Sequence, residues 1–185
     1  MPVFELSEKM KRQKLNQKGF TLIEVLVVVA IIGILLVMAY PNIMSSLETR
    51  GLENKAREIL TTLQQAKFQA VKFKMNYRVR FDDSTGPWIY YIEHETVPGT
   101  WVEVPGSYRR FIPSKYTVTV NFANEEVAFT PLGIVHYYQD CFEQNLAVSL
   151  QNISLQSPNL QRQGQPSTRT INVFAGGSVQ YVKST

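Results

Sequence analysis

A histidine, an aspartate and the only cysteine of the chain lie close together, at His136, Asp140 and Cys141. A thiol beside a base is the pattern of a cysteine nucleophile, because the base can convert the thiol into the attacking thiolate. His136, however, falls in an aromatic run, Cys141 opens a loop, and no neighbouring segment resembles an oxyanion hole. We therefore interpret the three residues as structural and expect no catalytic site.

The other sequence patterns that carry chemistry are also missing from these 185 residues. We find no glycine-rich phosphate loop, zinc-ligand spacing, paired carboxylates or acidic calcium-ligand cluster. A single cysteine permits no intramolecular disulfide and no cysteine-based metal cluster. The sequence therefore predicts a protein that is not an enzyme and that needs no metal and no cofactor.

The most informative residues surround the junction between Gly19 and Phe20. Five basic residues and two glutamates precede the junction, whereas Phe20–Tyr40 contains only two clearly polar side chains, Thr21 and Glu24. An ordinary secretory signal places its apolar core before the cleavage site. A peptidase that cut after Gly19 would instead leave the apolar segment on the mature protein. Because Gly19 has no side chain, its backbone could enter a protease cleft closely.

Glu24 is the most costly residue of the apolar segment. An ionised carboxylate in hydrocarbon costs about 2.5 to 3.5 kcal/mol on insertion scales, so such a residue usually has a partner. Phe20 lies four residues earlier on the same helix face, which makes a contact between Glu24 and a new N-terminus at Phe20 geometrically feasible. The alternative is an ordinary signal anchor whose Glu24 reaches the lipid headgroups. The order of leader, junction, glutamate and apolar helix favours a leader cleaved from a retained helix over an ordinary signal anchor.

The elements around these residues form a consistent series. Residues 1–19 make a polar, basic leader, and residues 20–40 make a helix of about 31 Å, enough to span a bilayer. The leader has a surplus of three positive charges out of the net +4, which favours a cytoplasmic N-terminus. Pro41 should kink or break the helix. Residues 41–75 then form an amphipathic half, whose apolar residues recur at spacings of three and four.

Residues 76–185 are predicted to form a β-rich head that packs on the amphipathic half of the helix. Short runs of β-branched and aromatic residues predict strands at 77–81, 88–93, 100–104, 116–121, 126–129, 134–138, 147–153, 170–174 and 178–182. Residues 154–169 are polar and are expected to form an exposed loop. The predicted fold class is α+β, with a long N-terminal helix packed on an antiparallel sheet.

The segment from Lys18 to Val25, Lys-Gly-Phe-Thr-Leu-Ile-Glu-Val, resembles the class III signal of type IV pilins and type II secretion pseudopilins. The resemblance implies that a prepilin peptidase cleaves after Gly19 and methylates Phe20. It also implies that Glu24 is the glutamate that sets the filament register by pairing with the N-terminal amine of a neighbouring subunit. The chain's own N-terminus remains the other candidate partner of Glu24.

Two patches of the head resemble GspH/FimT-type minor pseudopilins. They are the Phe129–Gly133 turn and the segment from Ile171 through Gly176-Gly177 to Val179. The resemblance implies a minor pseudopilin of a type II secretion pseudopilus, a periplasmic filament that supports protein secretion. The alternative is a FimT-like minor type IV pilin that acts in pilus assembly or DNA uptake.

The same resemblance implies the location and the partners. The protein is expected to cross the inner membrane once, with a cytoplasmic N-terminus and a periplasmic head, and then to enter a periplasmic pseudopilus. The implied partners are other pilins or pseudopilins, the prepilin peptidase and the assembly platform of the inner membrane.

A nucleic-acid interface is the alternative of another class. Basic residues that could contact phosphates, two of them beside aromatic residues that could stack on bases, are Arg109, Arg110, Arg162, Arg169 and Lys183. Without residues 1–19 the remaining side chains carry only about +1. This near neutrality favours solvated surface residues over a nucleic-acid site.

Overall fold

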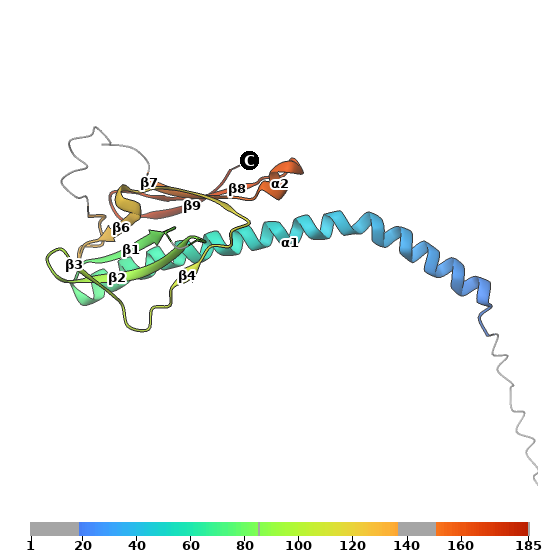
Figure 1. The fold of residues 1–185 in the computed structure, drawn as a ribbon, viewed down its shortest axis with the longest axis horizontal. Coiled ribbons are helices and arrows are strands. Elements are labelled where there is room, and N and C mark those ends of the chain that lie inside the picture. The colour runs from blue at the N-terminus through green and yellow to red at the C-terminus, as the bar shows by residue number, and fades with distance from the viewer. Residues whose placement is uncertain (1–18, 85, 137–150, 185) are drawn as a thin grey trace, which may run out of the picture. The chain divides into compact units, whose positions relative to one another are not determined.

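A computed structural model describes residues 19–84, 86–136 and 151–184 (Figure 1). The helix α1 (Leu22–Phe73) opens the described chain and continues through Pro41, so the helix does not end at this proline. That Pro41 bends the helix stays a prediction. The structure divides into two compact units, one of which ends at Pro41 and the other of which begins at Asn42.

The first unit contains the part of α1 that precedes the division. Its large apolar side chains are all exposed, with Leu22 at 83% and Val37 at 76%. Among the described residues, α1 is the one helix that is long and apolar enough to cross a membrane. The most apolar stretch of this helix has no buried residue.

The second unit, which we call the head, contains two antiparallel sheets (Figure 1). The first sheet has the order β3-β2-β1-β6, and a short strand, β4, also pairs with β2. Its strands are β1 (Tyr77–Asp82), β2 (Ile89–Val97), β3 (Thr100–Glu103), β4 (Arg110–Phe111) and β6 (Glu126–Phe129). The turn η1 (Ala123–Glu125) leads into β6.

The second sheet has the order β5-β7-β8-β9. Its strands are β5 (Thr117–Asn121), β7 (Gln151–Gln156), β8 (Thr168–Val173) and β9 (Val179–Ser184). The buried residues of β8 alternate with less buried ones, as expected for a strand with one face on a core.

Both sheets bury their inner faces against the second half of α1. The helix contributes side chains without exposed surface at spacings of three and four, namely Leu52, Ala56, Ile59, Leu63, Ala66 and Ala70. The sheets contribute residues such as Val79, Phe81, Ile153 and Ile171 to the same cluster. Burying each large aliphatic side chain stabilises the fold by about 1.5 to 3 kcal/mol. The α+β fold class and the apolar face of the helix are confirmed, although Val71 at its end is 39% exposed.

The exposed loop predicted at residues 154–169 is wrong. The strand β7 continues to Gln156, and the short helix α2 (Pro158–Arg162) follows. Ser157 caps this helix by accepting a hydrogen bond from the Leu160 amide at 3.5 Å, and both residues are fully buried. A serine before a proline is a helix-start signal that outweighs the polar composition of this stretch.

Two predicted strands lie partly outside the described residues. Of residues 134–138, Val135 forms an isolated bridge with Phe129, and residues 137 and 138 are not described. Of residues 147–153, the described part belongs to β7. The two-residue strand β4 was not predicted, because so short a run carries no periodicity.

Candidate functional site

The residues at the start of α1 form a helix cap. The amide of Glu24 donates to Thr21 Oγ1 at 3.3 Å, and the amide of Val25 donates to the Thr21 carbonyl at 3.3 Å. A threonine followed three residues later by a glutamate is the capping-box pattern. Sequence reasoning missed this cap, although the Thr-x-x-Glu spacing is a local signal that could have revealed it. Thr21 therefore caps the helix at the point where it begins.

The Gly19-Phe20 junction lies just before this cap, in non-helical chain. Phe20 is 81% exposed, and a Cβ atom added to Gly19 would meet no atom of the described residues within 4 Å. The described part of the fold therefore does not require a glycine at this position. The leader up to Lys18 lies outside the described residues.

The first turns of α1 place Glu24 among exposed apolar side chains. Glu24 is exposed, and its neighbours Ile23 and Val25 are 64% and 52% exposed. A carboxylate among aliphatic side chains suits the end of a membrane helix or the contact between two helices, where a cation from outside the chain could neutralise it.

The two head patches singled out in the sequence touch each other. Gly133, in the turn after β6, has a φ of +76°, and Gly177, in the hairpin before β9, has a φ of +73°. A Cβ atom on Gly177 would lie 1.9 Å from the carbonyl oxygen of Gly133, so no larger residue fits there without a backbone shift. A Cβ atom on Gly133 would lie 3.0 Å from Val71 of α1. The turn, the hairpin and the end of α1 thus meet at one place.

The candidate nucleic-acid residues of the first sheet are paired with groups of the chain. Arg109 forms an ion pair with Glu103 at 3.1 Å, and its guanidinium lies 4.8 Å from the centre of the Tyr91 ring. Arg110 donates to the Thr62 hydroxyl and lies 3.6 Å from a carboxylate oxygen of Glu58. These contacts occupy part of the donor capacity that phosphates would need.

The candidate residues near the second sheet differ in their exposure. Arg162 donates to Asn159 at 2.6 Å and is exposed, and Lys183 lies 3.4 Å from Glu53. Arg169 has no exposed surface, so the prediction that it contacts nucleic acid is wrong. Sequence reasoning placed Arg169 in an exposed loop, whereas its side chain faces the interior from β8.

Glu53 of α1 holds the buried Arg169 in place. Arg169 Nη2 donates to a carboxylate oxygen of Glu53 at 3.2 Å, and Nη1 donates to the carbonyls of Pro166 and Thr168. Burial opposes the ionisation of Glu53, but hydrogen bonds from Lys183 and Arg169 outweigh it and hold the pKa of Glu53 below its ordinary value. This ion pair joins the helix to the second sheet.

Only one residue of the sequence pattern His136, Asp140 and Cys141 lies in the described part of the structure. His136 is exposed and its amide donates to the Ala128 carbonyl at 2.8 Å, whereas Asp140 and Cys141 lie outside the described residues. Within the part of the chain that the structure describes, no group of three or more histidine, cysteine, aspartate or glutamate residues could hold a metal ion.

A comparison with protein families matches the N-terminal part of the chain. Residues 14–40 match the prokaryotic N-terminal methylation motif. No curated protein sequence matches the chain significantly.

Two solved structures share the fold. The type IV minor pilin FimU of Pseudomonas aeruginosa is similar with a TM-score of 0.52 and 18% identity, over 73% of this chain and 90% of that chain. The minor pseudopilin EpsH of the type 2 secretion system of Vibrio cholerae is similar with a TM-score of 0.52 and 10% identity, over 71% of this chain and 96% of that chain. The chain thus combines a prokaryotic N-terminal methylation motif and an apolar N-terminal helix with a pilin-like fold.

Proposed function

We propose that the protein is a membrane-anchored subunit of a pilus-like filament, cleaved after Gly19 and methylated at Phe20. The observation that carries the proposal is the exposed apolar half of α1, from Leu22 to Pro41, which no described residue buries. Such a surface is costly in water and suits first a bilayer and then contact with the same helix of other subunits. The open junction at Gly19 is consistent with a glycine that serves a peptidase.

The topology follows from the charges and from the helix. The basic leader keeps the N-terminus on the cytoplasmic side of the inner membrane, and the helix crosses the membrane once. The head then lies in the periplasm. Glu24 pairs with an N-terminal amine, either that of a neighbouring subunit or its own, and thereby sets the register between subunits.

Among pilus-like filaments, we propose the pseudopilus of a type II secretion system, in which the protein is a minor pseudopilin that supports secretion. The likeness to EpsH, a minor pseudopilin of such a system, supports this assignment. The partners would be other pseudopilins, the prepilin peptidase and the assembly platform of the inner membrane.

A minor type IV pilin is the second candidate, supported by the likeness to FimU at the same TM-score and a higher identity. Deleting the gene in its host separates the two functions. Loss of protein secretion with normal pili supports the pseudopilin, whereas loss of pili with normal secretion supports the pilin.

A role in DNA uptake rests on Arg109, Arg110, Arg162 and Lys183, each of which also bonds to a group of the chain. Binding of the purified protein to duplex DNA at two salt concentrations tests this role. Affinity no greater than that of a neutral control protein, with no dependence on salt, would exclude it.

Intact mass spectrometry of the protein extracted from membranes tests the processing. The expected mass is that of the chain without residues 1–19 and with one added methyl group. Recovery of the full-length chain from a host that contains the peptidase would contradict the proposed function.

A further inference from the structure

The outer edge of β9 carries backbone groups that no described residue uses. The Phe174 amide donates to the Ser178 carbonyl at 2.9 Å, which fixes the alternation of hydrogen bonds between β8 and β9. In an antiparallel pair, hydrogen-bonded residue pairs alternate with pairs that are not hydrogen-bonded, and residues of the second kind point their backbone groups away from the partner strand. Phe174 and Ser178 are a hydrogen-bonded pair, so the next pair, Val173 and Val179, is of the second kind. Val179, Tyr181 and Lys183 therefore direct their amides and carbonyls outward. Because β9 ends the order β5-β7-β8-β9, these groups face no strand in the described part of the head.

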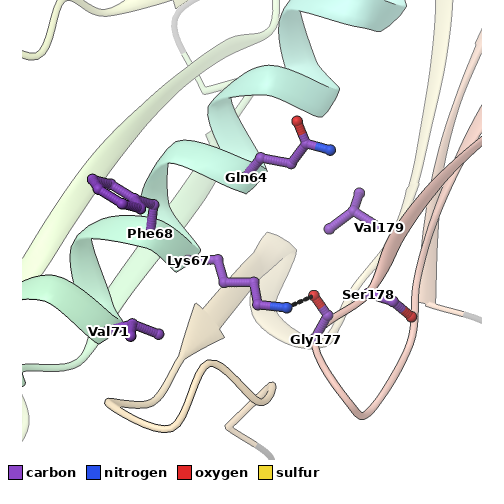
Figure 2. A pocket seen from close by; sticks show the side chains of 7 residues that line it. All are labelled: Gln64, Lys67, Phe68, Val71, Gly177, Ser178 and Val179. Carbon is purple, nitrogen blue, oxygen red and sulfur yellow. Dashed lines mark hydrogen bonds between the residues drawn. The ribbon is translucent and has the colours of Figure 1, made fainter.

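A hollow lies beside the start of this edge, between α1 and the hairpin that leads into β9 (Figure 2). Its volume is about 330 Å³, and the residues that line it are Gln64, Lys67, Phe68, Val71, Gly177, Ser178 and Val179. Figure 2 shows Lys67 reaching across to the hairpin, where its Nζ donates to the Gly177 carbonyl at 2.8 Å. Phe68 is 64% exposed and Val71 is 39% exposed, so the helix side of the hollow presents apolar surface to solvent.

The helix α1 follows β9 along its length. Glu53 lies 3.4 Å from Lys183, and the guanidinium carbon of Arg57 lies 5.4 Å from the centre of the Tyr181 ring. The bond from Lys67 to Gly177 continues this series at the other end of the strand. A strand added beside β9 would therefore run along α1, with its side chains on that face near the hollow.

The charges along the edge of β9 indicate which side chains a bound segment would carry. The cations are those of Arg57 and Lys183, which are exposed, and of Lys67, which is half-buried. The nearby carboxylate is that of Glu53, which the buried Arg169 already shares. Among the described residues, no carboxylate lies within ion-pair distance of Arg57 or Lys67. The edge therefore has a positive surplus that acidic side chains would neutralise.

We propose that the edge of β9 binds an extended acidic segment of another protein, which adds to the second sheet as a further strand. An extended segment offers the backbone donors and acceptors that the outward groups of Val179, Tyr181 and Lys183 need, whereas a helix has already used its own. Its apolar side chains contact Phe68 and Val71 at the hollow, and its carboxylates lie near the basic residues. This binding does not depend on the filament function proposed above.

A defined peptide tests the proposal on the full chain in detergent. The probe is a capped heptapeptide of alternating glutamate and valine, compared with one of alternating lysine and valine. We expect saturable binding of the acidic peptide, binding of the lysine peptide weaker by about tenfold or more, and slowed hydrogen exchange at the amides of residues 179, 181 and 183. Equal affinity of the two peptides, or unchanged exchange at these amides, would overturn the proposal.

Two exposed phenylalanines provide matched variants. Phe68→Ser removes apolar surface at the hollow and should weaken the binding of the acidic peptide by about tenfold. Phe111→Ser removes a similarly exposed ring from β4 and should leave the affinity unchanged, while equal melting temperatures show that both variants fold. A version of the peptide with alternate amides methylated should not bind, independently of any variant. An equal loss in Phe111→Ser, or binding of the methylated peptide, would contradict pairing at the edge of β9.

Discussion

The two halves of α1 differ in both apolar content and surroundings: the first half is almost entirely apolar, and the second half is amphipathic. From Leu22 to Pro41 the large apolar side chains are exposed, whereas from Leu52 to Ala70 the residues of one face have no exposed surface. The buried face of the second half combines large residues such as Leu63 with small ones such as Ala66, and it packs in one cluster with residues of both sheets. The first half has large aliphatic residues on every side. One helix thus contains a segment that packs in the core of the head and a segment that no described residue of the chain buries.

The largest expected effect is that of substituting Glu24, which lies in the first half of α1. We expect Glu24→Ala to leave the stability of the head unchanged and to reduce incorporation into filaments. The loss of one partner from an ion pair of low solvent exposure costs on the order of 3 kcal/mol, or about a hundredfold in incorporation. Quantifying wild type and variant in purified filaments, with equal amounts in the membrane, measures the effect.

Glu24→Gln serves as the control for this substitution, because glutamine at this position still suits the cap formed with Thr21. Normal assembly of Glu24→Gln would mean that the charge of Glu24 is not needed. Equal incorporation of Glu24→Ala and wild type would contradict the proposed role of Glu24 altogether.

A pair of leucine substitutions compares the halves directly in stability. Leu63→Ala should lower the free energy of unfolding of the head by about 3 kcal/mol, because it leaves a cavity in the core. Leu36→Ala, at a side chain that is 62% exposed, should change it by less than about 0.5 kcal/mol. Both tryptophans, Trp88 and Trp101, lie in the head, so their fluorescence during urea unfolding reports its stability. A large effect of Leu36→Ala would show that the first half contributes to the fold of the head.

The contact between the helix and the second sheet is tested by Glu53→Gln. This substitution leaves the buried guanidinium of Arg169 without its carboxylate and should lower the free energy of unfolding by about 2 kcal/mol. Glu103→Gln, which breaks the exposed pair with Arg109, should have little effect, since exposed ion pairs contribute little. If both variants unfold at the same urea concentration as wild type, burial of Arg169 does not depend on Glu53.

The smallest expected effect is a dependence on pH. Because the pKa of Glu53 is lowered in the folded state, its contribution is present at neutral pH and is lost as the pH falls through that pKa. The free energy of unfolding should therefore decrease below about pH 4, where the unfolded chain takes up protons more readily. We expect a shallower decrease in Glu53→Gln than in wild type. Parallel curves for the two proteins would contradict the assignment to Glu53.

The sequence predicts those features whose signals are local. The spacing of Leu52, Ala56, Ile59 and Leu63 predicts the buried face of the helix, and the run Glu126–Phe129 predicts β6 with its observed bounds. Such periods depend only on which residues share a face, so they need no knowledge of distant parts of the chain. The cap of Thr21 and Glu24 was equally local and was missed.

Features that depend on distant partners could not be predicted in this way. Arg169 is buried because Glu53, 116 residues earlier, supplies a carboxylate, and no local pattern contains that pairing. The contact between Gly133 and Gly177 likewise joins two turns from different sheets, which the sequence treats as separate patches. Whether a polar segment is exposed therefore depends on the tertiary structure around it.

The position of the Thr21 cap has a consequence for the chemistry of a chain that begins at Phe20. The aligned peptide dipoles of α1 place a partial positive charge at its first turn, where the amides of Glu24 and Val25 meet Thr21. Cleavage after Gly19 would put a new ammonium group one residue before this cap, where the helix field repels it. A carboxylate such as Glu24 would then be favoured by that field and by the ammonium at once. A carboxylate near the start of the helix, from the same chain or from a neighbouring chain, would therefore stabilise the new N-terminal ammonium group.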